Sequence, residues 1–213
     1  MIHSANGAST EGLIKLGVHK TQGFEEMRYF ANTGLVICLT LVAGCMRGPN
    51  LGRTGAGGLA VGDQAPAIQI QQLVHGASLD AEAAGAVQVI EFWATWCGPC
   101  LSGMPHLSEL QQVYRDQVTI LGITSEDLST VEAFLASSAG DGGTWADVVK
   151  YRMAIDDNGA TGAAYMRAAG INSIPTAFIV GKDGVLQWIG HPASIDEPLK
   201  AVVEGTWQLP EAN

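Results

Sequence analysis

The stretch from Glu91 to Cys100 reads EFWATWCGPC, with two cysteines directly after an apolar and aromatic run. Gln88 to Trp93 (QVIEFW) is β-branched and aromatic without a helical period, which predicts a buried strand. Apolar residues return at helical spacing over 101–114, which predicts a helix. The two cysteines, Cys97 and Cys100, therefore lie between a strand and a helix, a setting typical of a redox-active dithiol.

The expected place of Cys97 at the start of that helix gives a physical reason for its reactivity. Unpaired backbone N–H groups and the helix dipole stabilise a thiolate there, and the thiolate is the nucleophile of disulfide exchange. We therefore predict that Cys97 attacks a disulfide. Cys100, one turn further and expected to be better buried, would resolve the mixed disulfide. Pro99 suits the first turn because its missing N–H is not needed there.

Two other interpretations of the cysteine pair are less favoured. A structural zinc site needs four ligands, and the sequence offers neither a second C-x-x-C nor histidines at ligand spacing. His75, His106 and His191 are better explained as ordinary surface or core histidines. A purely structural disulfide would not need the flanking tryptophans, Trp93 and Trp96. We expect no metal and no other cofactor.

Glu91 lies six residues before Cys97, inside the apolar strand. A carboxyl group buried there should have a raised pKa and could take or give the proton of Cys100. The alternative is a solvated glutamate on an edge strand. We favour the proton-relay role, because a perturbed carboxyl beside a reactive pair is typical of a functional site.

The rest of the chain alternates between the two kinds of pattern. Four more segments have the composition of strands: 118–124, 151–155, 176–180 and 185–189. Three have the pattern of helices: 129–137, 158–169 and 198–204. Residues 61–73 suggest a short extended lead-in, and Ser129 is predicted to cap its helix in a capping box with Glu132. This order predicts an α/β fold whose central sheet has parallel pairs, helices on both faces and a hairpin at one edge.

Composition bears on the classes of partner. The 213 residues are 47% hydrophobic, enough for one domain with a core and some extra length. The net charge is −10, and no cluster of Lys or Arg follows Arg28. A nucleic-acid partner is not expected, because binding phosphates needs a basic face.

The N-terminal part predicts an export signal. The run GLVICLTLVAGC, ending at Cys45, is shorter than the roughly 20 residues of a membrane-spanning helix but matches a signal-peptide core. Its last four residues resemble a bacterial lipobox, which implies that Cys45 is lipidated and becomes the first mature residue. Cys38 would then be removed with the signal. A short buried helix with a chance cysteine is the alternative.

These features divide the chain into four parts. Met27 begins a compact signal over 27–44, so residues 1–26 are expected to be a non-native extension upstream of the true start. An unusually long signal is the alternative. Residues 45–60 are rich in glycine and are expected to be a flexible tether. The folded domain is expected over 61–209.

This domain resembles the thioredoxin superfamily, and specifically its TlpA-like, membrane-tethered extracytoplasmic branch. Four features carry the resemblance: FWATWCGPC with both tryptophans, Pro105 in the following helix, Ile174-Pro175-Thr176, and KDGVLQWIGHP over 182–192. The resemblance implies a thioredoxin-like fold with a central mixed sheet. It also implies an extra helix–strand insertion between Thr124 and Asp156. Pro105 would bend the helix that carries the dithiol.

The resemblance also implies roles for single residues. Pro175 would be a cis proline, which an X–Pro bond tolerates cheaply, and with Ile174 it would offer backbone groups to a substrate chain beside the dithiol. Trp96 would form an apolar docking surface, whereas Trp93 is interpreted as core. Thioredoxins commonly have Asp at the position of Glu91, so the side chain of this protein is longer there than is usual in the family.

Together these features predict a membrane-tethered thiol-disulfide oxidoreductase that reduces extracytoplasmic proteins through Cys97 and Cys100. Its partners would be disulfide-containing or dithiol proteins, a membrane thiol electron donor and, through a lipid anchor, the membrane itself. A donor is needed because that compartment is oxidising. Apocytochrome c is one candidate target, although Thr176 stands where relatives dedicated to it often carry an acidic residue. Inner and outer membrane both stay open.

Three other functions compete with this one. A peroxiredoxin-like peroxidase is disfavoured because its P-x-x-x-T-x-x-C pattern is incomplete, with Thr95 only two residues before Cys97 and the proline missing. A disulfide-forming oxidase of the same fold would use the same residues and stays open. A non-catalytic binding module is disfavoured because both cysteines, Pro175 and Glu91 are retained together.

Overall fold

The computed structural model describes residues 58–77, 85–140 and 143–210. The predicted N-terminal extension, the signal over 27–44, the lipidation site Cys45 and the tether up to residue 57 lie outside these described residues. The structure therefore bears on the predicted domain and not on its anchor.

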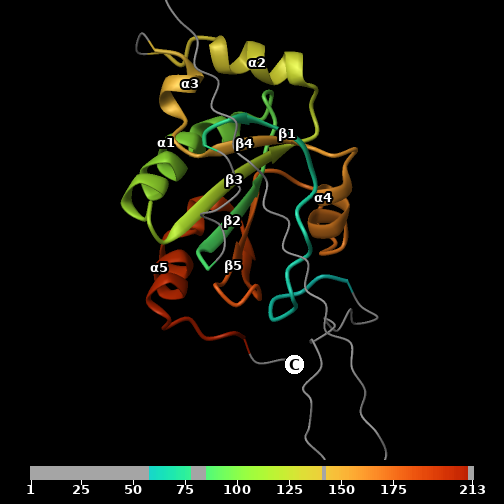
Figure 1. Ribbon diagram of the computed structural model, residues 1–213, viewed down its shortest axis with the longest axis vertical. Helices are drawn as coiled ribbons and strands as arrows, with labels where there is room; N and C mark the ends of the chain where they lie inside the picture. Colours follow the sequence, from blue (N-terminus) through green and yellow to red (C-terminus); the bar gives the residue numbers. More distant parts are fainter. Residues whose placement is uncertain (1–57, 78–84, 141–142, 211–213) are drawn as a thin grey trace, which may run out of the picture. The chain divides into compact units, whose positions relative to one another are not determined.

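A six-stranded mixed sheet forms the centre of the domain (Figure 1). Across the sheet the strands are β1 (Ile70–His75), β4 (Arg152–Asp156), β3 (Val118–Thr124), β2 (Val87–Phe92), β5 (Thr176–Val180) and β6 (Leu186–Gly190). The β2–β3 and β3–β4 pairs are parallel, and the other three pairs are antiparallel. The predicted mixed sheet with an edge hairpin, here β5–β6, is confirmed.

Helices cover both faces of this sheet, as predicted. One face carries α1 (Gly98–Val113), α2 (Leu128–Ala136), α3 (Trp145–Val148) and α5 (Asp196–Glu204), the last preceded by the 3₁₀ turn η2 (Pro192–Ser194). The other carries α4 (Ala160–Gly162) and the π-helical turn η1 (Ala163–Arg167), seen opposite α1 and α5 in Figure 1. The helix–strand insertion expected between Thr124 and Asp156 is present as α2, α3 and β4.

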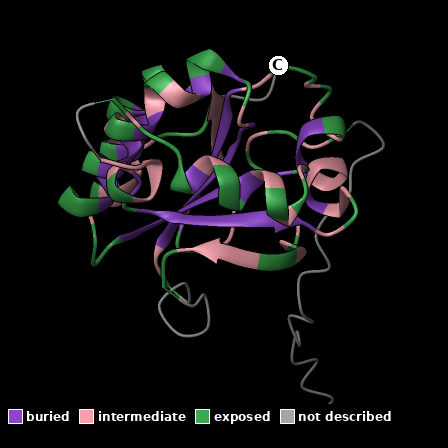
Figure 2. Ribbon diagram, turned by 90° about the horizontal axis from the view of Figure 1, so that it is seen from above, coloured by how far each residue is buried: buried purple, intermediate pink, exposed green. Residues whose placement is uncertain are grey.

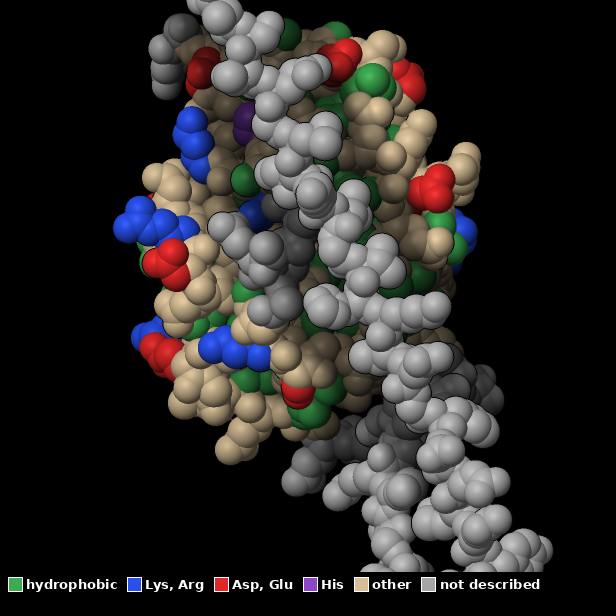
Figure 3. Space-filling model, in the orientation of Figure 1, with side chains coloured by type: hydrophobic (Ala, Val, Ile, Leu, Met, Phe, Trp, Pro, Cys, Tyr) green, Lys and Arg blue, Asp and Glu red, His purple; other side chains and the backbone are tan. Residues whose placement is uncertain are grey.

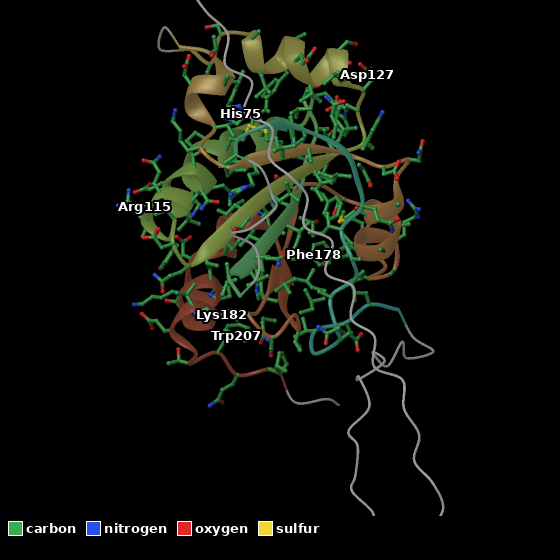
Figure 4. All side chains as sticks on the ribbon, in the orientation of Figure 1. His75, Arg115, Asp127, Phe178, Lys182 and Trp207 are labelled. Carbon is green, nitrogen blue, oxygen red and sulfur yellow. A yellow bond between two sulfur atoms is a disulfide. The ribbon has the colours of Figure 1, made fainter. Side chains whose placement is uncertain are left out.

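Strand β2 shows why the core has two halves. Successive side chains of a strand point to opposite faces. Val87 and Val89 accordingly join the core under α1, and Ile90 and Phe92 join the core under η1. Figure 2 shows the buried strands enclosed between partly exposed helices, and the ring of Phe178, labelled in Figure 4, packs edge-on against Phe92. Both faces of β2 are buried over most of its length, as expected for a central strand of mainly apolar residues.

Strand β1 was not predicted as part of the sheet. The sequence suggested only an extended lead-in, but Ile70–His75 pairs antiparallel with β4 at the edge of the sheet. Two register shifts interrupt this pairing. They break the alternation of buried and exposed side chains by which a strand is normally recognised.

The predicted cap of α2 is wrong by two residues. Asp127, not Ser129, is the N-cap: its carboxylate accepts hydrogen bonds from the Ser129 hydroxyl and from the Thr130 backbone N–H at 2.9 Å (Figure 4). These bonds, led by that of Ser129, lower the pKa of Asp127 to about 2. A charged acceptor nearer the helix start takes the place of the expected Ser129–Glu132 capping box.

None of the helices among the described residues is long and apolar enough to cross a membrane. On the face drawn in Figure 3, Lys and Arg side chains are interspersed with Asp and Glu.

Trp207, labelled in Figure 4, follows α5 and donates its indole N–H to the backbone carbonyl of Gln187 at 2.9 Å. This bond holds the C-terminal segment against β6.

Candidate active site

Cys97 and Cys100 form a disulfide at the N-terminus of α1. Cys97 is the N-cap of this sixteen-residue helix, and its Sγ accepts a hydrogen bond from the backbone N–H of Cys100 at 3.3 Å. Pro99 occupies the first turn, and that turn holds no acidic residue. The free N–H groups and the positive end of the helix dipole thus face the sulfur of Cys97, as a stabilised thiolate requires.

The expected difference in burial between the two cysteines is not found. Cys97 is 4% exposed and Cys100 is 3% exposed, so both sulfurs lie in the core under α1. The neighbours of Cys97 are open instead: Trp96 is 74% exposed, and Gly98 and Pro99 are exposed as well. A partner would therefore reach Cys97 across this exposed flank.

The peptide bond between Ile174 and Pro175 is cis. Thr176, the next residue, begins β5 and pairs with Phe92 at the end of β2, where the chain leads towards the cysteines. Ile174 packs against the core cluster that contains both cysteines, and the Thr176 hydroxyl donates to the Ser173 carbonyl at 2.8 Å. The structure thus places the proline segment and the dithiol at the same end of the sheet.

Glu91 is buried in β2, between β3 and β5, so the alternative of a solvated edge-strand glutamate is wrong. Its register neighbours are Gly122 of β3 and Ala177 of β5, which bring no charge. Its Oε2 atom has no hydrogen-bond partner among the described residues. Burial raises the pKa of Glu91 to about 8. A group that gains and loses a proton near neutral pH therefore lies on the same sheet face as the dithiol.

Residues 60–204 match the Redoxin family. The chain belongs to this family. It is 30% identical over 132 residues to the thioredoxin-like protein YneN of Bacillus subtilis, covering 61% of this chain and 71% of the relative. It is 27% identical over 137 residues to the thiol-disulfide oxidoreductase ResA of Bacillus thuringiensis, covering 62% and 72%.

A solved structure shows the same fold. The crystal structure of a putative thiol:disulfide interchange protein DsbE from Chlorobium tepidum matches with a TM-score of 0.52 and 22% identity. The match covers 68% of this chain and 99% of that one. The expected thioredoxin-like fold is thereby confirmed. With its cysteine pair closed as a disulfide, this Redoxin-family chain is a thiol-disulfide oxidoreductase.

One residue that the sequence did not indicate, Glu126, fixes the loop before Cys97. The carboxylate of Glu126 accepts two hydrogen bonds from Thr95, one from its backbone N–H at 2.8 Å and one from its hydroxyl at 2.7 Å. The hydroxyl of Thr124 adds a third at 3.1 Å. Thr95 and Glu126 are 31 residues apart, so no local pattern pairs them. Glu126 thus ties the redoxin's active-site loop to the end of β3.

Replacement of Glu126 by alanine should loosen this loop. Hydrogen bonds to a charged group contribute about 1.5–3 kcal/mol each when buried, and this carboxylate is only half-buried. We expect the free energy of unfolding to fall by about 1–3 kcal/mol, and amide hydrogen exchange at Thr95 to become faster. Glu132→Ala on exposed α2 surface is the matched control. Unchanged exchange at Thr95 in Glu126→Ala would show that the loop does not depend on the carboxylate.

A hollow of about 520 Å³ lies beside the dithiol, lined among others by Pro99, Ser102, His106, His191 and Asp196. Nothing in the sequence indicated that His106 and His191 line the same hollow. His106 Nε2 lies 3.0 Å from a carboxylate oxygen of Asp196, which links α1 to α5. Across the described ranges, no group of three or more His, Cys, Asp or Glu side chains is arranged to hold a metal ion. The hollow is a surface feature of the domain next to Pro99.

Proposed function

We propose that this chain reduces disulfides of extracytoplasmic proteins while tethered to a membrane through a lipid on Cys45. The observation that carries the catalytic part is the Cys97–Cys100 pair at the start of α1, with Glu91 buried on the same sheet face. The names of ResA and YneN agree with thiol-disulfide chemistry. The tether and the compartment are supported by the signal and lipobox patterns of the sequence.

The electrons would move in two steps. The Cys97 thiolate attacks one sulfur of the substrate disulfide, a mixed disulfide forms, and the first substrate thiolate leaves. Cys100 then attacks the sulfur of Cys97, the Cys97–Cys100 disulfide closes, and the second substrate thiolate leaves. The substrate gains two electrons and the chain loses two. The closed disulfide in the structure is the product state of this cycle.

The second step needs a base, because only the thiolate of Cys100 is nucleophilic. We assign that role to Glu91, whose carboxylate takes the Cys100 proton and later returns it when the disulfide is reduced again. Its pKa of about 8 leaves both protonation states populated near neutral pH.

Substrate contacts are assigned to the exposed flank of Cys97. Trp96 would offer apolar surface to the partner, since it is 74% exposed where a core residue of its size would be buried. The backbone at Ile174 and Pro175 would pair with the substrate chain, because this segment precedes β5 at the same end of the sheet as the dithiol. Reduction of the closed disulfide would then require a membrane thiol donor.

The reduction potential of the Cys97–Cys100 couple tests the direction of electron flow. The full chain would be equilibrated in graded thiol–disulfide buffers, and the two cysteines followed by alkylation and peptide mass spectrometry. A potential near that of thioredoxin, about −270 mV, supports the reductase. A potential near about −120 mV, that of the strong oxidant DsbA, would instead make the chain a disulfide-forming oxidase. The absence of a reversible couple would exclude thiol-disulfide catalysis.

A further inference from the structure

Three buried side-chain atoms lack a hydrogen-bond partner among the described residues: Glu91 Oε2, Trp93 Nε1 and the hydroxyl of Tyr151. Each of these residues is about 2% exposed. A buried polar group left without a partner loses its hydrogen bonds to water and gains none in return, which destabilises the fold. Three unrelated cases in one domain would therefore be expensive, and such groups call for an explanation.

Two of these side chains, Trp93 and Tyr151, pack over a single glycine that is the register neighbour of the third. Gly122 of β3 is the register neighbour of Glu91. A Cβ atom at Gly122 would lie 3.2 Å from Trp93 Nε1 and 3.2 Å from Cε2 of Tyr151. The lack of a side chain at Gly122 leaves room for both rings over the strand that neighbours Glu91. Burial raises the pKa of Tyr151 well above its usual range, and the negative charge of Glu91 raises it further, so the two groups interact.

The three groups are chemically complementary. An indole N–H can only donate a hydrogen bond, a tyrosine hydroxyl can donate and accept, and an ionised carboxylate can only accept. The set thus contains two donors and the acceptor that would satisfy them both. A protonated Glu91 cannot accept from both donors as strongly, because hydrogen bonds to a charged oxygen are about twice as strong as neutral ones.

We propose that the Tyr151 hydroxyl and the Trp93 indole N–H are the hydrogen-bond donors that receive the Glu91 carboxylate when it is ionised. Tyr151 is then a positioning residue, which acts on the reaction through Glu91. The inference rests on the proposed proton relay and adds to it the groups that make ionisation possible inside the core.

The arrangement has a defined place in the cycle. Before the second exchange step Glu91 is ionised and held by the two donors. It then takes the proton from Cys100 and becomes neutral, while the new thiolate attacks Cys97. The register neighbours of Glu91 on β3 and β5 are Gly122 and Ala177, whose side chains offer no hydrogen bond. Tyr151 is a titratable group that the negative charge of Glu91 affects.

Tyr151→Phe tests the inference, because it removes the hydroxyl and keeps the buried ring. In the oxidised full chain neither Cys97 nor Cys100 titrates, so the carboxyl of Glu91 can be followed alone by ¹³C NMR. We expect the Glu91 pKa to rise by about one unit, a tenfold loss in its ionisation constant. The pH profile for closure of a mixed disulfide at Cys97 should move to higher pH by the same amount.

Tyr165→Phe is the matched control. Tyr165 is equally buried, but it lies in the other half of the core and its hydroxyl donates to the Pro66 carbonyl at 2.7 Å. This variant loses a tyrosine hydroxyl and its hydrogen bond, yet it should leave both the Glu91 pKa and the closure profile unchanged. Equal shifts in the two variants would assign the effect to general loosening of the core and overturn the inference.

Glu91→Gln separates this inference from the proposed relay. If Tyr151→Phe changes nothing while Glu91→Gln flattens the pH profile of closure, the relay stands and the role of Tyr151 is wrong. If Glu91→Gln also leaves the rate and profile unchanged, the relay itself is wrong. Should Tyr151→Phe fail to fold, Trp93→Phe removes the other donor, and an unchanged Glu91 pKa in that variant would equally contradict the proposal.

Discussion

Replacement of Cys100 by serine is expected to stop turnover and to leave the substrate covalently attached to Cys97. The variant keeps the nucleophile at the start of α1, so the first exchange still occurs and the mixed disulfide forms. No second thiol is then present to attack it. We expect turnover to fall at least about a thousandfold, as when a covalent catalyst loses one of its reacting groups. Non-reducing electrophoresis after mixing with a disulfide-containing protein would detect the adduct.

Cys97→Ser is the matched control for this trap. It should be as inactive as Cys100→Ser, but it should form no adduct, because Cys97 and not Cys100 is the N-cap whose neighbours Trp96 and Gly98 are exposed to a partner. The opposite result would be an adduct on Cys100 in the Cys97→Ser variant and none on Cys97 in the Cys100→Ser variant. It would show that the nucleophile is Cys100 and the resolving cysteine is Cys97.

Replacement of Glu91 by glutamine is expected to stabilise the domain at alkaline pH. In the unfolded chain the carboxyl loses its proton near its ordinary pKa of 4.5, whereas the folded protein holds it until about 8. The unfolded state therefore binds fewer protons between these values, and the stability of the wild-type protein falls as pH rises through this window. The full shift corresponds to roughly 4–5 kcal/mol above pH 8.

Glutamine removes the charge but leaves a buried amide, so we expect a net gain of roughly 2–4 kcal/mol at pH 9 and little difference at pH 4. Urea unfolding of the oxidised proteins at pH 4, 6 and 9 measures this. Glu132→Gln on exposed α2 surface should follow the wild-type curve at every pH. Parallel curves for wild type and Glu91→Gln would mean that Glu91 ionises in the folded protein as readily as in water. A stabilised but slower variant would show that the core retains the glutamate for function.

Much of the site could be predicted because it depends on residues that are close together in the sequence. An apolar run followed directly by a C-x-x-C motif predicts three of its features: the strand ending at Phe92, the helix after Cys97 and the burial of Glu91. The cis bond before Pro175 could be expected only through the resemblance to a known superfamily. These features are adjacent in the chain or are set by residue types with narrow conformational preferences.

The missed features depend on tertiary contacts. Glu126 holds Thr95 partly through a backbone N–H, a donor that every residue but proline carries and that no side-chain pattern reveals. Tyr151 becomes relevant only because Gly122 leaves room beside Glu91, in a register that the folded sheet sets. The end of the helix predicted over 158–169 winds as the π-helical turn η1, a rare local geometry that apolar spacing does not indicate.

The two edges of the sheet have a consequence for how partners meet this domain. An open, regular edge strand invites another chain to add itself by backbone hydrogen bonds. Here β1 is interrupted by two register shifts, and β6 is partly covered because Gly62 and Asp63 exchange backbone hydrogen bonds with Leu186. Neither side offers a long template for intermolecular pairing. Extension of the sheet at either edge is therefore disfavoured, and we expect an extended polypeptide to pair instead with the short segment before β5, at the same end of the sheet as the cysteines.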